Sequence, residues 1–138
     1  MQLIEYENKV SFLSLGRLSN EIINLLDLSI NEQDIIFWYD RITHIRKHQL
    51  EFEDERGFAS FINHIPEVVN HPDYVVLHPD LTSIKFIKRF EFNMVVAVRV
   101  SISGKLHVRT AFTITQNKLE NYILKNSAKR CSQHIDTD

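Results

Sequence analysis

The chain has 138 residues, of which 43% are hydrophobic and 25% are charged, and its formal net charge at pH 7 is -2. This composition predicts one globular domain with its own core and excludes a largely disordered chain. It also excludes the positive field over a whole protein that many nucleic-acid binders carry, so a site for a polyanion requires a local gathering of cations.

The cysteine content and the N-terminus both favour a cytoplasmic protein. Cys131 is the single cysteine, which excludes an internal disulfide framework and indicates a reducing compartment. It follows a polar segment, which is a poor place for an activated thiolate. The first residues lack the basic and apolar segments of a secretory signal, and no apolar run approaches the ~20 residues of a membrane span.

The N-terminal half is expected to be mainly helical, with two short extended or apolar runs. Ser19 and Asp40 are suitable N-caps, because their side chains accept hydrogen bonds from the free N–H groups of a first helical turn. Pro66 is expected to kink or restart a helix. In chain order, the expected elements are an extended segment at 10–15, a helix after Ser19, an apolar run at 34–38, a helix from Asp40 to about residue 52 and a helix around 58–69.

Strand-like runs dominate after His71-Pro72-Asp73, at residues 74–78, 84–91, 94–102 and 106–114. Turn residues between them favour hairpins, and Thr115 can cap a last helix. We therefore expect an α+β fold with N-terminal helices packed on a C-terminal four-stranded antiparallel meander sheet, and a final short helix. Residues 1–126 are expected to form this domain, and residues 127–138 a polar C-terminal tail.

Alternation along the last strands predicts a local basic surface on one face of the sheet. Its expected members are Lys85, Arg89, Arg99, His107 and Arg109. The same alternation puts Thr110 on the apolar side, opposite Arg109, unless a bulge changes the register. The competing interpretation is a solvated sheet face whose cations serve solubility. Arg99 argues for a function, because it interrupts an otherwise apolar strand.

Two histidines, His44 and His48, lie one helical turn apart in the helix expected after Asp40. At about 100° per residue they share a flank with Arg41, at the border of the apolar side. Most of the other histidines are expected to be structural. A shared metal ion is a competing interpretation, but the zinc-protease pattern requires Glu after the first histidine, where this chain has Ile45. No metal and no other cofactor is expected.

Three short motifs follow one another in a recognisable order. His44-Ile45-Arg46-Lys47-His48 gives HIxxH, Asn70-His71-Pro72-Asp73 gives NxPD at a helix end, and Arg109-Thr110 lies on the last strand. Over roughly residues 35–125, this order resembles the phage-associated barnase–EndoU–colicin–RelE-like nucleases.

The resemblance implies a toxin-like, metal-independent endoribonuclease, in which the RNA 2′-OH is the nucleophile and no metal-bound water is needed. It implies His44 or His48 as the acid/base group, and Arg109 with Thr110 as the phosphate-contacting pair. The expected substrate-binding residues are Arg41, Lys85, Arg89, Arg99 and His107. RNA, such as tRNA or mRNA, is the expected partner, together with an antitoxin or immunity protein.

Two other functions fit the same chain. The near-neutral charge and the missing carboxylate base favour a non-catalytic RNA-binding module that uses the same surface. The acidic cluster at residues 51–55 favours a protein-interaction domain of a phage or toxin–antitoxin system, with that cluster as its contact face.

Overall fold

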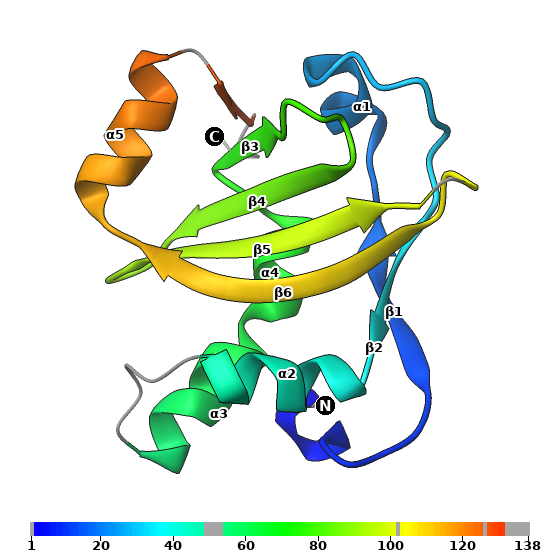
Figure 1. The fold of residues 1–138 in the computed structure, drawn as a ribbon, viewed down its shortest axis with the longest axis vertical. Coiled ribbons are helices and arrows are strands. Elements are labelled where there is room, and N and C mark those ends of the chain that lie inside the picture. Colours follow the sequence, from blue (N-terminus) through cyan, green and yellow to red (C-terminus); the bar gives the residue numbers. More distant parts are fainter. Residues whose placement is uncertain (1, 49–53, 102, 126, 132–138) are drawn as a thin grey trace, which may run out of the picture.

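A computed structural model describes residues 2–48, 54–101, 103–125 and 127–131, which fold around one mixed sheet (Figure 1). Within these residues, seven strands pair in the order β1-β2-β6-β5-β4-β3-β7. The strands are β1 Phe12–Arg17, β2 Asp34–Trp38, β3 Tyr74–Leu77, β4 Ser83–Arg89, β5 Asn93–Val100, β6 Leu106–Ile114 and β7 Ala128–Arg130. The helices are the 3-10 helix η1 Leu3–Tyr6, α1 Asn20–Leu25, α2 Asp40–His48, α3 Glu55–Asn63, α4 Ile65–Asn70 and α5 Gln116–Leu124.

The predicted sheet of four antiparallel strands is wrong. β3 to β6 do pair antiparallel in chain order. However, β2 adds to β6 in parallel, through Ile35 opposite Leu106 and Ile36 opposite His107, and β1 pairs with β2 beyond it. The physical reason is that parallel neighbours are joined by a long crossover, which leaves no turn signal in the sequence.

The segment predicted to be a polar tail begins with a strand. β7 pairs antiparallel with β3, with Tyr74 opposite Arg130 and Val76 opposite Ala128. The sheet is therefore extended at both ends, and the fold is a mixed α+β arrangement. Residues 132–138 of that segment lie outside the described part of the chain.

Local signals place the helix starts well. The Ile22 N–H donates to Ser19 Oγ (3.3 Å) and the Lys118 N–H donates to Thr115 Oγ1 (3.1 Å), as the predicted caps require. Pro66 lies in the first turn of α4, where its missing N–H costs nothing. The predicted end of the histidine helix, and residues 51–53 of the acidic cluster, lie outside the described residues.

The two faces of the sheet bury cores of different size. η1 and α1 to α4 cover one face, where Phe37, Phe61 and Phe86 are among the largest fully buried side chains. α5 contributes Leu119 to a smaller core against Ile87 on the other face. Lys85 of β4 lies beside this smaller core, where it contacts Tyr122 of α5. No helix among the described residues is long and apolar enough to cross a membrane.

A close contact fixes α4 against β1. The Asn70 side-chain amide donates to the backbone carbonyls of Leu15 and Pro66, each at 2.8 Å. Gly16 stands directly against that amide, and a Cβ at this position would overlap Asn70 Oδ1. Glycine is therefore required here by the close approach of another side chain. The asparagine of the NxPD motif thus joins a helix to a strand.

Candidate active site

A cleft of about 570 Å³ opens between α2, the β3–β4 turn and the polar part of the sheet. Figure 1 shows α2 running beneath β6, on the side of that strand away from β5. Six of the side chains predicted for the site line this cleft, namely Arg41, His44, His48, Lys85, Arg109 and Thr110. Residues far apart in the sequence therefore meet in one hollow.

A β-bulge in β6 decides which side chains reach the cleft. Val98 of β5 lies opposite Val108, but the preceding residue of β5, Ala97, lies opposite Thr110. Arg109 is thus an extra residue in β6 with no counterpart on β5. The strand bends at such a residue, and the alternation of its side chains shifts by one.

The bulge corrects the predicted orientation of Thr110. Val108 and Ala111 both enter the large core, although they are three residues apart and simple alternation would put them on opposite faces. Thr110 consequently faces the open side of the sheet, as His107 does before the bulge. Arg109 and Thr110 therefore line the same cleft, instead of lying on opposite faces.

The orientation of α2 follows from its buried and charged sides. Ile42 and Ile45 are fully buried. Arg46, on the side away from the cleft, binds Glu7 (2.7 and 2.8 Å) and Glu55 (2.6 and 2.9 Å). Its guanidinium also lies 4.3 Å from the centre of the Phe58 ring. Hydrogen bonds to Glu55 and then Glu7 raise the pKa of Arg46, so this anchor stays charged.

The two histidines of α2 are in mutual contact, with ring centres 4.8 Å apart. Burial lowers the pKa of His44 below its ordinary value of 6.5, and the positive charges of Arg41, His48 and Arg109 lower it further, against an opposing effect of Asp40. The neutral imidazole of His44 therefore predominates at pH 7 and is able to accept a proton.

Cations surround these histidines. Arg41 Nη1 donates to the backbone carbonyl of Arg109 (3.4 Å), and its Nε contacts Asp40 Oδ1 (3.2 Å). Lys85 Nζ donates to the hydroxyl of Tyr122 on α5 (3.2 Å). The cleft thus brings three cationic side chains, two from the sheet and one from α2, to a single place. Such an arrangement suits a phosphate group.

The β3–β4 turn adds a third histidine, which was not among the predicted site residues. His78 lines the same cleft, and its Nδ1 lies 2.9 Å from Asp80 Oδ1. Asp80 also accepts from Thr82 Oγ1 (2.6 Å) and from the Thr82 N–H (2.9 Å). These two bonds, and then His78, hold the pKa of Asp80 at about 2. The sequence signal was Asp80 itself, two residues after a histidine and two before a threonine, which is the spacing of an Asx turn.

Arg99 and His107, both predicted to bind substrate, lie in an adjoining hollow of about 350 Å³. They are opposite each other on β5 and β6. Arg41 and Arg109 line this hollow as well as the cleft, so the two spaces share a wall. The predicted basic surface therefore extends without a break from Lys85 in the cleft to Arg99 in the adjoining hollow.

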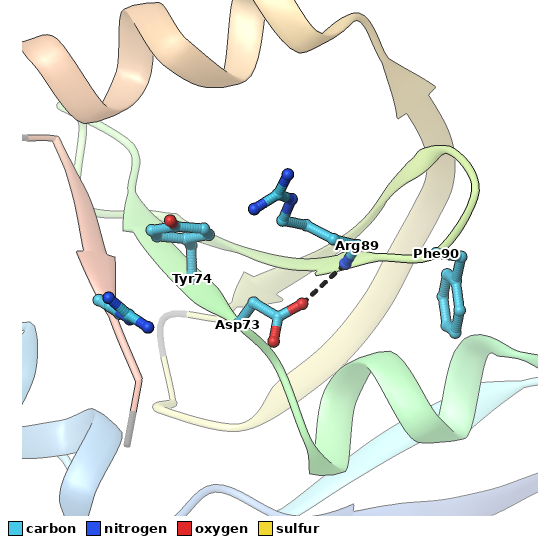
Figure 2. Close-up of a pocket in the computed structure, with 5 residues that line it drawn as sticks. Asp73, Tyr74, Arg89 and Phe90 are labelled. Atoms are coloured by element: carbon cyan, nitrogen blue, oxygen red, sulfur yellow. Dashed lines mark hydrogen bonds between the residues drawn. The ribbon is translucent and has the colours of Figure 1, made fainter. Parts of the chain in front are cut away.

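Arg89 does not join this surface. It lines a separate pocket of about 320 Å³ with Asp73, Tyr74, Phe90 and Arg130, and Figure 2 shows its guanidinium on the same side of the strand as the Tyr74 ring. The Arg89 N–H donates to Asp73 Oδ2 (2.8 Å), which ties the end of the NxPD motif to β4. Arg89 is the one predicted substrate-binding residue that the fold places apart from the others, because it lies at the far end of β4.

Metal ligands are not grouped in the part of the chain that the structure describes. No three His, Cys, Asp or Glu side chains there are arranged to hold an ion. The chemical groups that the cleft offers are imidazole, guanidinium, ammonium, carboxylate and hydroxyl.

The model of the phage-Barnase-EndoU-ColicinE5/D-RelE like nuclease3 family matches residues 14–121. The chain belongs to this nuclease family. No curated protein and no solved structure matches it. The matched segment runs from β1 into α5, and it includes every residue that lines the cleft. The resemblance read from HIxxH, NxPD and the Arg-Thr pair is thus confirmed at the level of the family.

Proposed function

We propose that this nuclease is a metal-independent, toxin-like endoribonuclease that cleaves RNA by attack of a 2′-OH on the adjacent phosphate. The observation that carries the proposal is the single cleft shared by the histidines of α2 and the Arg109-Thr110 bulge of β6. A reaction of this type needs a proton acceptor, a proton donor and a cationic site for the phosphate, all within reach of one another.

His44 is the proposed general base. Its lowered pKa favours the neutral imidazole, which takes the proton of the 2′-OH as the new bond from the 2′-oxygen to phosphorus forms. The bond from phosphorus to the 5′-oxygen then breaks, and a second imidazole of the cleft, His48 or His78, gives that oxygen a proton. The products are a 2′,3′-cyclic phosphate and a free 5′-OH, so no water is consumed in this step.

Arg109, Arg41 and Lys85 are the proposed phosphate contacts. Negative charge grows on the non-bridging oxygens as phosphorus becomes five-coordinate, and fixed guanidinium groups stabilise that charge. Thr110, on the same face through the bulge, supplies a hydroxyl donor to one of these oxygens. Asp80 orients the His78 ring from outside the reacting atoms.

The proposal is tested by incubating the purified protein with end-labelled single-stranded RNA, total RNA and tRNA in EDTA. We expect fragments that carry a 2′,3′-cyclic phosphate, and no cut where the attacking nucleotide is 2′-deoxy. His44→Ala is expected to lower the rate roughly 10²- to 10⁴-fold, and Arg109→Ala to lower it as well. His71→Ala and Arg56→Ala are matched controls, because both residues are exposed and neither lines the cleft.

Absence of cleavage by the wild-type protein, or equal rates for His44→Ala and His71→Ala, would show the proposal to be wrong. Salt-sensitive RNA binding without any product would instead favour a non-catalytic RNA-binding module.

The proposal extends to an antitoxin or immunity protein as a partner. A toxin-like nuclease damages the cell that makes it, so the wild-type chain is expected to be produced poorly without its partner. His44→Ala should restore its yield. Equal yields of both chains in the same host would argue against toxicity.

A further inference from the structure

Two large aromatic side chains stand exposed beside the basic surface. Trp38, the last residue of β2, has 43% of its surface exposed, and Phe12 of β1 has 48%. The two residues are paired across the β1–β2 ladder, and their ring centres lie 4.7 Å apart with the planes tilted by 49°. We call this pair the aromatic platform. Two neighbouring rings with nearly half of their surface exposed form a contiguous apolar patch rimmed by polar groups, which is a candidate place for a ligand.

The aromatic platform adjoins the cleft. Trp38 lines the hollow that holds Arg99 and His107, and that hollow shares Arg41 and Arg109 with the cleft. A phosphate held by Arg109 would therefore have the indole of Trp38 as a neighbour on one side. Positive charge next to an exposed ring is the combination that binds single-stranded nucleic acid, since the cations contact the backbone and the ring contacts a base.

A hydrogen bond fixes the indole and the imidazole relative to each other. Trp38 Nε1 donates to His107 Nδ1 at 3.2 Å. His107 Nδ1 is therefore the acceptor, and the proton of the neutral ring lies on Nε2. Nε2 is thus a donor, suited to a phosphate oxygen or a base carbonyl. This bond assigns His107 to substrate contact instead of proton abstraction through Nδ1.

We propose that the aromatic platform binds an unpaired base of single-stranded RNA, next to the phosphate that is cleaved. The base stacks on Trp38, and Arg99 and His107 Nε2 contact the phosphate beyond it. The position of the cleaved phosphate in the cleft rests on the proposed function, whereas the stacking of a base on Trp38 does not. The occupant is single-stranded because the bases of a duplex are stacked on each other and present no free face.

The experiment uses tryptophan fluorescence, since Trp38 is the only tryptophan of the chain. The protein is titrated with a 2′-O-methyl RNA oligonucleotide, which lacks the nucleophile and stays intact, and binding is followed in parallel by polarisation of a labelled end. We expect saturable quenching by the single strand and none by the same sequence in a duplex. An abasic nucleotide walked along the strand should abolish quenching at one position, at a fixed offset from the cleavage site.

Variants separate the platform from the reaction. Trp38→Leu is expected to raise KM for long RNA roughly ten-fold, a much larger effect than it has on kcat. Trp38→Phe should recover part of the affinity that Trp38→Leu loses, because a phenyl ring still stacks although the hydrogen bond to His107 is gone. Phe92→Ala removes another exposed aromatic ring, which lies against Phe61 and Phe90 and lines neither the cleft nor the adjoining hollow, and should change neither parameter.

Binding without quenching, or an unchanged KM for Trp38→Leu, would overturn the platform. Cleavage of RNA with either of those results would leave the proposed function standing. Quenching by the single strand with no cleavage of any RNA would support the platform and refute the proposed function. An absence of RNA binding by polarisation would refute the platform directly.

Discussion

Gly16→Ala is the substitution whose cost follows most directly from the structure. The new Cβ would overlap Asn70 Oδ1, so the Asn70 side chain must move away from its place between β1 and α4. It would then lose its two hydrogen bonds, to the carbonyls of Leu15 and Pro66. Each bond contributes about 1 kcal/mol, so loss of the two bonds by itself should lower the free energy of unfolding by about 2 kcal/mol. For a domain of this size, that corresponds to a drop of about 6–8 °C in Tm.

A double-mutant cycle isolates this contact. Asn70→Ala alone removes the same two hydrogen bonds and should cost a similar free energy. In the Asn70→Ala background the overlap is gone, so adding Gly16→Ala should cost about 2 kcal/mol less than it does in the wild-type chain. Unfolding in urea, followed by circular dichroism, gives all four values. Additive costs would refute the overlap as the cause.

The same variants carry a functional expectation. Neither Gly16 nor Asn70 lines the cleft. RNA cleavage by both variants, measured well below their Tm, should therefore match that of the wild-type protein. A large loss of activity in folded Asn70→Ala would show that the first residue of the NxPD motif acts in the reaction as well as in the fold.

Three further predictions concern charge and protonation. Burial and then Arg41 lower the pKa of His44, so the acid limb of the kcat/KM profile should lie below pH 6.5. In Arg41→Gln this limb should move to higher pH. A limb that does not move would exclude His44 as the titrating base. If the cleft and the adjoining hollow hold one phosphate each, log K for single-stranded RNA should fall against log salt with a slope of about -1.4, and Arg99→Gln should reduce that slope by up to about 0.7. Burial first, and then nearby carboxylates, raise the pKa of Cys131 to about 12, so a disulfide reagent should react slowly with the native protein and rapidly in denaturant. Since the unfolded thiol loses its proton at lower pH than the folded one, stability should decline as pH rises above about 8.5; a flat profile there would contradict this assignment.

Short-range features of the fold were predictable from the sequence. Ser19 and Thr115 were identified as caps because a cap depends on residues only three positions apart. The strands β3 to β6 were located because tight turns separate them. The periodicity of a helix was sufficient to predict that Arg41, His44 and His48 share one flank of α2.

Long-range features were not predictable in the same way. β2 joins β6 through two residue pairs, Ile35 with Leu106 and Ile36 with His107, and nothing near either segment marks the other. The bulge at Arg109 was foreseen only as a condition for Thr110 to face the cleft. Whether an extra residue is accommodated depends on the partner strand, which sets the register from outside the segment.

The junction of α2 with β6 has a consequence for the synthesis of the chain. Arg41 and the backbone of Arg109 are in contact although 68 residues separate them, and Trp38 meets His107 across 69 residues. A nascent chain therefore carries its histidine helix long before the strand that would hold a phosphate has been translated. Pairing over such a distance is slow, because the entropy of closing the long loop is lost before the contacts form. A product that ends before β6 would lack Arg109 and Thr110, so the proposed cleft can form only after β6 has been translated.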